Sequence, residues 1–172
     1  MHLDATDFEL FDVPPTFAQD RAVLDARWKE LQREAHPDRF AAQGHAAQRV
    51  AMQWSVRINE AYQRLKDPVR RATYICTLNG APIDAEHNTS MPADFLMQQM
   101  EWRESLDDAS GAAALEALHD EVEAARRRAL SSLDWLIDEK GDYPGAAAQV
   151  RALMFIERFA HDVTGRLDQL GQ

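Results

Sequence analysis

Two long amphipathic segments on either side of a proline constrain the fold of this chain most strongly. In the segment from Asp20 to about Ala35, apolar residues recur at spacings of four, three and four, at Leu24, Trp28, Leu31 and Ala35. The segment from about Gly44 to Lys66 repeats the pattern at Val50, Trp54, Ile58, Ala61 and Leu65. This spacing places each set on one helix face. Pro37 ends the first helix, because the residue before a proline is disfavoured in the α region. Two such helices with a tight connection predict an antiparallel hairpin.

Shorter elements complete the first half of the chain. Residues 6–11 predict a short helix stopped by Pro14 and Pro15, and Asp67-Pro68 separates the long second helix from another over 69–78. Residues 79–91 contain glycine and proline with little periodicity, which is typical of a linker. We therefore expect an N-terminal domain over 1–78.

Three helical segments follow the linker, over about 92–106, 112–139 and 145–170. The middle segment keeps a regular apolar seam at Leu115, Leu118, Val122, Ala125 and Ala129. The last has a wider stripe at Leu153, Ile156, Phe159, Ala160, Val163, Leu167 and Leu170. Short breaks between amphipathic helices predict a three-helix bundle over 92–172. The fold class is therefore all-α: a helical hairpin with short helices, linked to a C-terminal three-helix bundle.

Composition narrows the functional classes. The net charge of −10 argues against broad nucleic-acid binding, which needs cations facing the phosphates. Cys76 is the only cysteine, so an internal disulfide and a four-cysteine zinc site are both impossible. Residues 1–20 do not resemble a signal peptide, and no apolar run reaches membrane-spanning length. We expect a cytoplasmic protein without metal or cofactor.

The connection between the two long helices has an unusual composition. His36 and Asp38 flank a proline with fixed φ, which predicts a stiff, polar, exposed tip. Lys29 and Arg33 lie opposite the apolar stripe of the preceding helix, at about 100° per residue. Together with Arg39 they form a cationic track that leads to this tip.

Residues 6–78 resemble the J domain. The matching positions are His36-Pro37-Asp38, Asn59, Ala61, Tyr62, Leu65, Asp67-Pro68, Arg71, Ala72 and Tyr74. In that family the tip and the basic helix dock on an acidic surface of a DnaK-type chaperone and trigger its ATP hydrolysis. The resemblance implies this contact role for Lys29, Arg33, His36, Pro37, Asp38 and Arg39. Arg39 stands where many members have lysine; it keeps the charge and changes the geometry.

The segment 95–106 has more apolar residues than one bundle helix needs. On a helical projection, Phe95, Trp102 and Leu106 share the side that can face a bundle core. A second side holds Leu96, Met97 and Met100 with Glu101 and Glu104 beside them. Periodicity leaves two readings open: this side packs against the first domain, or it is an exposed interface. Phe155, at the edge of the last helix's stripe, belongs either to the bundle core or to this second side.

A J domain followed by a linker and a bundle that begins Phe-Leu-Met is similar to the HscB family over nearly the whole chain. The resemblance implies a co-chaperone of iron–sulfur cluster assembly that binds an IscU-type scaffold protein and delivers it to an HscA/DnaK-type ATPase. The implied scaffold contacts are Leu96, Met97, Met100, Glu101, Glu104 and Phe155. Met100 stands where members often have leucine, which an apolar surface tolerates.

Three alternatives have weaker support. An enzyme would use His36 and Asp38 as an acid/base pair and Cys76 as a nucleophile, but Cys76 lies in an apolar stretch typical of a core. A helix-turn-helix nucleic-acid binder is suggested by the run Arg126–Arg128, which acidic neighbours make more typical of an ion-paired helix face. The third alternative is a J-domain protein whose bundle recruits another client.

Overall fold

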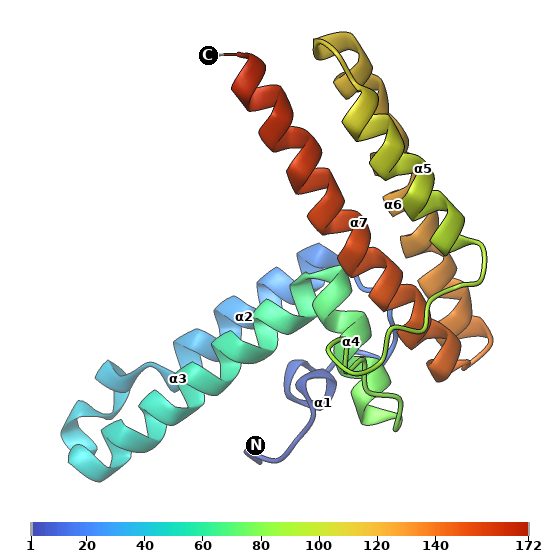
Figure 1. Cartoon of the computed structure of the whole chain (residues 1–172). Helices are drawn as coiled ribbons and strands as arrows, with labels where there is room; N and C mark the ends of the chain where they lie inside the picture. The colour runs from blue at the N-terminus through green and yellow to red at the C-terminus, as the bar shows by residue number, and fades with distance from the viewer. Residues whose placement is uncertain (1, 172) are drawn as a thin grey trace. The chain divides into compact units, whose positions relative to one another are not determined.

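The computed structural model describes residues 2–171, which form helices and loops and contain no strand. The helices divide into two compact units, one up to residue 75 and one from residue 76 onward (Figure 1). Within residues 2–171, none of the helices has the length and apolar character needed to span a membrane. The all-α fold class is confirmed.

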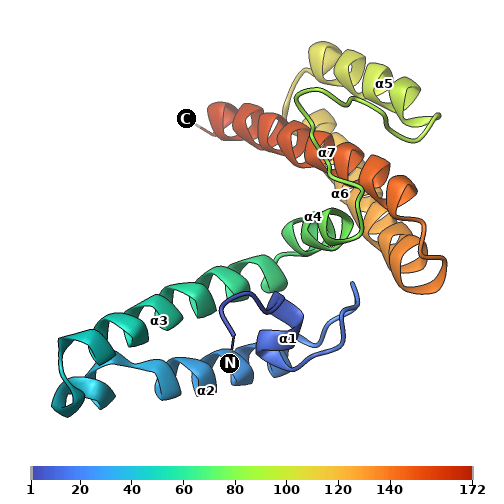
Figure 2. The ribbon, with the colours of Figure 1, turned by 90° about the horizontal axis from the view of Figure 1, so that it is seen from below.

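The first unit is built on the predicted hairpin of α2 (Arg21–Ala35) and α3 (His45–Lys66), which lie side by side in Figures 1 and 2. Asp20 caps α2 as expected, because its carboxylate accepts a hydrogen bond from the Ala22 N–H at 2.9 Å. The buried residues are Leu24 and Ala35 of α2 and Ala51, Ile58, Ala61, Tyr62 and Leu65 of α3. Placing Val50 in the stripe was wrong: Ala51 takes the inward position, and Val50 is exposed.

The connection between α2 and α3 is longer and more regular than predicted. Residues Pro37–Gln43 form a 3₁₀ helix, η1, with Pro37 in its first turn, where a missing N–H costs nothing. Gly44 ends η1 with φ of 97°, a left-handed conformation that favours glycine. The tip is therefore a structured turn of helix instead of a bare loop.

A buried carboxylate ties the short helix α1 (Asp7–Phe11) to the hairpin. Asp7 is fully buried and accepts hydrogen bonds at 2.7 Å from both Arg57 and Arg64 of α3. Its backbone N–H donates to the Tyr74 hydroxyl of α4 (Pro68–Leu78) at 3.0 Å. The bond to Asp7 also raises the pKa of the Arg64 guanidinium. Charge pairing therefore supplements apolar packing where α1 meets the long helix.

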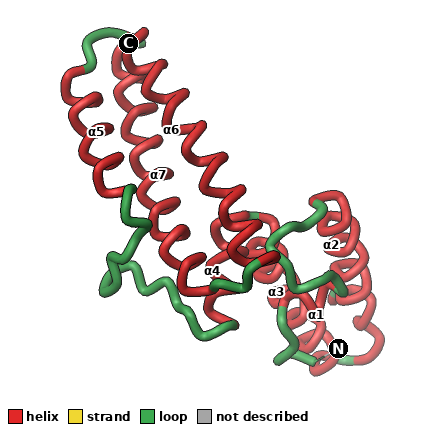
Figure 3. The backbone as a smooth tube through the Cα atoms, turned by 90° about the vertical axis from the view of Figure 1, so that its right-hand side faces the viewer, coloured by secondary structure: helices red, strands yellow, loops and turns green. Residues whose placement is uncertain are grey.

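The second unit contains the predicted three-helix bundle, made of α5 (Phe95–Asp108), α6 (Ala112–Leu133) and α7 (Tyr143–Leu170) (Figure 3). A π-helical segment, η2 (Asp134–Glu139), extends α6. Trp102 is buried and stacks on Phe159 with ring centroids 5.5 Å apart. Most residues of the predicted seams are buried, but Ala125, Ala160 and Leu167 are half-buried and Leu170 is exposed at the end of α7.

Candidate protein-binding surfaces

The tip between α2 and α3 presents polar side chains on a braced backbone. The side chains of His36 and Asp38 are 58% and 90% exposed. The Asp38 N–H donates to Nδ1 of His36 at 3.2 Å, so His36 caps η1. Because Nδ1 is then an acceptor, a neutral His36 ring carries its proton on Nε2. The tip therefore offers a carboxylate and an imidazole N–H to a partner.

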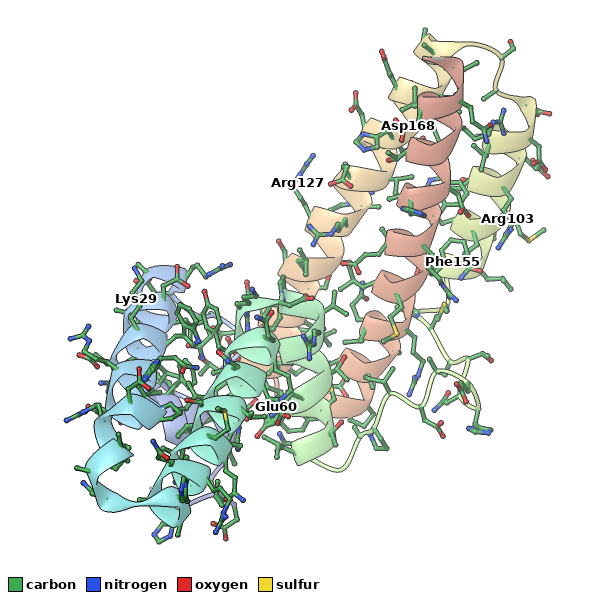
Figure 4. All side chains as sticks on the ribbon, turned by 90° about the vertical axis from the view of Figure 1, so that its left-hand side faces the viewer. Lys29, Glu60, Arg103, Arg127, Phe155 and Asp168 are labelled. Atoms are coloured by element: carbon green, nitrogen blue, oxygen red, sulfur yellow. The ribbon has the colours of Figure 1, made fainter. Side chains whose placement is uncertain are left out.

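The three cations predicted to lead to this tip are all exposed. Lys29, labelled in Figure 4, and Arg33 are exposed on α2. Arg39 is exposed too, but its Nη1 lies 3.4 Å from the carbonyl oxygens of both Arg33 and Glu34. These carbonyls belong to the last turn of α2 and have no partner within that helix. Arg39 therefore caps the C-terminus of α2 through these carbonyl oxygens, in addition to contributing charge.

The second side of α5 is an exposed apolar surface edged by acids. Leu96, Met97 and Met100 are 65%, 67% and 58% exposed. Glu101 and Glu104 are exposed beside them. We call these five residues the α5 patch. Large exposed apolar side chains grouped in this way make the α5 patch a candidate interaction site, because methionine adapts its shape to a partner.

The acidic edge of the α5 patch continues into a hollow of about 710 Å³ between α5 and α6. Glu101 and Glu104 line it together with Asp108 and Glu121, over a floor of Ala114, Ala117 and Leu118. Asp108 carries no apolar signal that would single it out in the sequence, although it lies one turn beyond Glu104 on the same face. Glu121 is on another helix, and only the tertiary packing reveals its position.

Phe155 lies in the bundle core and is only 7% exposed. Its ring meets Phe95 edge-on at 5.7 Å and stacks on Phe159 at 6.0 Å, and the Arg103 guanidinium lies over it at 5.6 Å (Figure 4). Of the two positions that periodicity left open for Phe155, the structure shows the bundle core, and its implied scaffold contact stays a prediction. Its aromatic contact holds the first turn of α5, which bears the patch.

The features behind the rival functions have structural roles. Cys76 is buried, and burial raises the pKa of its thiol to about 11, so the thiolate needed by a nucleophile is disfavoured. Arg126 forms an ion pair with Glu157 at 3.6 Å. Among residues 2–171, no three His, Cys, Asp or Glu side chains lie together as a metal site would require.

Comparison with known proteins agrees with this layout. A family model described as the HSCB C-terminal oligomerisation domain matches residues 91–164. The co-chaperone HscB homologue of Burkholderia thailandensis is 49% identical over 171 residues, covering 98% of this chain and 97% of the relative. The homologue of Burkholderia multivorans is 50% identical with the same coverage.

Solved structures show the same fold. Chaperone HscB from Vibrio cholerae superposes with a TM-score of 0.80 at 36% identity, covering 96% of this chain and 99% of that one. Human co-chaperone HscB, at 24% identity, gives a TM-score of 0.86 over 96% of this chain and 84% of its own. Because the Burkholderia thailandensis homologue is 49% identical over 98% of this chain, the chain belongs to the HscB family of co-chaperones.

Proposed function

We propose that this co-chaperone is an adaptor in cytoplasmic iron–sulfur cluster biogenesis, with two binding surfaces and no chemistry of its own. Residues 92–172 form the bundle that binds an IscU-type scaffold protein through the α5 patch. Residues 1–78 form a J domain that docks on an HscA/DnaK-type chaperone and stimulates its ATPase. Residues 79–91 link the two.

The exposure of the α5 patch is the observation on which the scaffold-binding role rests. Leu96, Met97 and Met100 are each more than half exposed although they belong to a well-packed bundle. Burying an apolar side chain of this size contributes roughly 1.5–3 kcal/mol, so leaving three in water is unfavourable unless a partner covers them. The acidic edge favours a scaffold surface that places basic residues around an apolar centre.

The tip supports the chaperone-docking role. Asp38 is exposed and its backbone is held by His36, so docking requires little additional ordering. Lys29 and Arg33 suit an acidic chaperone surface, and their charge accelerates association at low salt. Pro37 restricts the backbone that carries both polar groups.

The adaptor function predicts coupling between the two surfaces. A scaffold held on the bundle reaches the chaperone at a high effective concentration once the tip docks. Steady-state ATPase activity of the cognate chaperone is measured with scaffold alone, with this protein alone and with both. The stimulation by both together should therefore exceed the sum of the two separate stimulations. Additive rates would contradict the adaptor role. Stimulation by this protein without any gain from scaffold would indicate another client.

A further inference from the structure

Arg151 of α7 is a buried cation whose hydrogen-bond acceptors are backbone carbonyls. It is 5% exposed, and its Nε donates to the Ile83 carbonyl at 2.8 Å and its Nη1 to the Ser90 carbonyl at 2.9 Å. A third, longer contact of 3.4 Å joins Nη2 to the Pro82 carbonyl. No carboxylate of residues 2–171 forms an ion pair with it. The carbonyl oxygens therefore take the place of a carboxylate, because a buried guanidinium without hydrogen-bond acceptors is costly.

These carbonyls belong to the two ends of the linker. Pro82 and Ile83 lie near its start and Ser90 near its end, so one side chain holds both ends on α7. Ile83 is buried as well and adds an apolar anchor. Figure 3 shows the loop running from α4 to α5. The sequence shows only a segment of low periodicity, whereas its ends are fixed by specific bonds.

The anchored end of the linker lies close to the start of α5. Ser90 is five residues before Phe95, the first residue of α5. The α5 N-cap residue, Asp94, makes no capping hydrogen bond through its side chain. The Gln99 amide instead donates to the sulfur of Met91, in the linker, at 3.1 Å. The first two turns of α5 are therefore held by the linker bond to Gln99 and by the Phe95–Phe155 ring contact rather than by a side-chain cap.

From this geometry we propose that Arg151 is a positioning residue for the α5 patch. By holding the linker on α7, it fixes where α5 begins and keeps Leu96, Met97 and Met100 in the arrangement that a partner recognises. Arg151 itself is buried and touches no partner. The part of the inference that concerns binding rests on the proposed scaffold function; the part that concerns the linker and α5 does not.

Hydrogen exchange on the full-length protein tests the structural part. In Arg151→Gln, amides of residues 79–91 and of the first two turns of α5 should exchange at least about tenfold faster, with α6 unchanged. Arg151→Lys, which keeps the charge and loses the fork, should fall between. Arg158→Gln is the matched control. Arg158 is an exposed arginine two turns further along α7; it lines the hollow of about 720 Å³ beside the linker but forms no hydrogen bond with the linker.

A second variant keeps the test decisive if Arg151→Gln misfolds. Ile83→Ala removes the apolar anchor and leaves the buried charge paired, so it should accelerate exchange in the same two segments. Faster exchange throughout the bundle in Arg151→Gln would mean general unfolding, and the decision then rests on Arg151→Lys and Ile83→Ala. If the linker amides accelerate in these two and the α5 amides do not, Arg151 does not position α5 and the inference is wrong.

Calorimetric titration with the purified IscU-type scaffold tests the binding part. We expect about a three- to tenfold loss of affinity in Arg151→Lys and Ile83→Ala and none in Arg158→Gln. Leu115→Ala, which removes a fully buried side chain of α6, controls for a general loss of stability. Unchanged affinity beside accelerated α5 exchange would overturn the positioning role. If the native protein binds no scaffold, the proposed function fails, and the exchange data still decide whether Arg151 orders α5.

Discussion

Nδ1 of His36 accepts a hydrogen bond from the backbone N–H of Asp38 at 3.2 Å, so the two polar residues of the tip are joined directly. The bond starts the 3₁₀ helix η1 and fixes the backbone that carries the Asp38 carboxylate. His36 therefore has two possible contributions, ordering the tip and touching the chaperone, and substitutions can separate them.

His36→Gln and His36→Asn should differ in their effect. Asparagine is a good N-cap residue because its short side chain reaches the backbone N–H, whereas glutamine is too long. We expect amides 38–41 to stay protected from exchange in His36→Asn and to lose protection in His36→Gln, and chaperone ATPase stimulation to fall further in His36→Gln. Equal loss in both variants, with equal protection, would show that His36 acts only by direct contact.

Arg39 and Lys29 should respond differently to salt. Arg39 donates to the α2 carbonyls as well as carrying charge, so Arg39→Gln should lower maximal stimulation and flatten the salt dependence of chaperone binding less than Lys29→Gln does. Lys29→Gln, at an exposed position without such bonds, should weaken binding and flatten its salt dependence. Binding measured between about 50 and 200 mM salt distinguishes these results. A salt dependence as flat in Arg39→Gln as in Lys29→Gln would show that Arg39 acts only through its charge at the contact.

The α5 patch should account for most of the scaffold affinity. Met97→Ala/Met100→Ala removes two exposed methionine side chains, and we expect at least about a tenfold loss of affinity, or 1.4 kcal/mol. ATPase stimulation without scaffold should not change. Met52→Ala is a suitable control, because Met52 is 54% exposed on α3 and lies outside the patch. Equal losses in the control would remove the support for this surface.

Local patterns predicted most of the fold, because each helix carries its own periodicity and end signals. Asp20 caps the start of α2, and Asp67-Pro68 separates α3 from α4, so these helix boundaries depend only on neighbouring residues. Val50 was misplaced because Val50 and Ala51 are adjacent apolar residues, and a small shift in helix phase decides which one faces inward. The 3₁₀ helix Pro37–Gln43 has no apolar period that would reveal it.

The residues that make up the candidate surfaces were harder to predict from the sequence than the helices. Projection separated Leu96, Met97 and Met100 from Trp102 because all four lie on one helix. It could not place Phe155, since burial at the edge of a stripe depends on α5 packing against α7. The carbonyl partners of Arg151 lie more than 60 residues away in sequence and carry no side-chain signature.

The thiol of Cys76 should resist alkylation and weaken the fold at high pH. Burial raises its pKa from 9.0 to about 11, so the folded state holds the proton more tightly than the unfolded state. The stabilisation is fully present below pH 9 and is lost as pH rises towards 11. Iodoacetamide at pH 8 should label it rapidly only in denaturant. The free energy of unfolding should fall more steeply over pH 9–11 than in Cys76→Ala; parallel curves would contradict the shift.

Asp7→Ala should destabilise the first unit more than any surface substitution. The fully buried Asp7 carboxylate satisfies Arg57, which is largely buried, and Arg64. Removing it leaves two guanidinium groups without their anion, a change that costs about 3–5 kcal/mol for a buried pair. Urea unfolding followed by circular dichroism should show an earlier transition for this unit. Arg21→Ala, which removes an exposed pair with Asp25, should cost much less, because water and salt screen an exposed pair. Similar losses in both variants would mean that α1 is held by its apolar contacts alone.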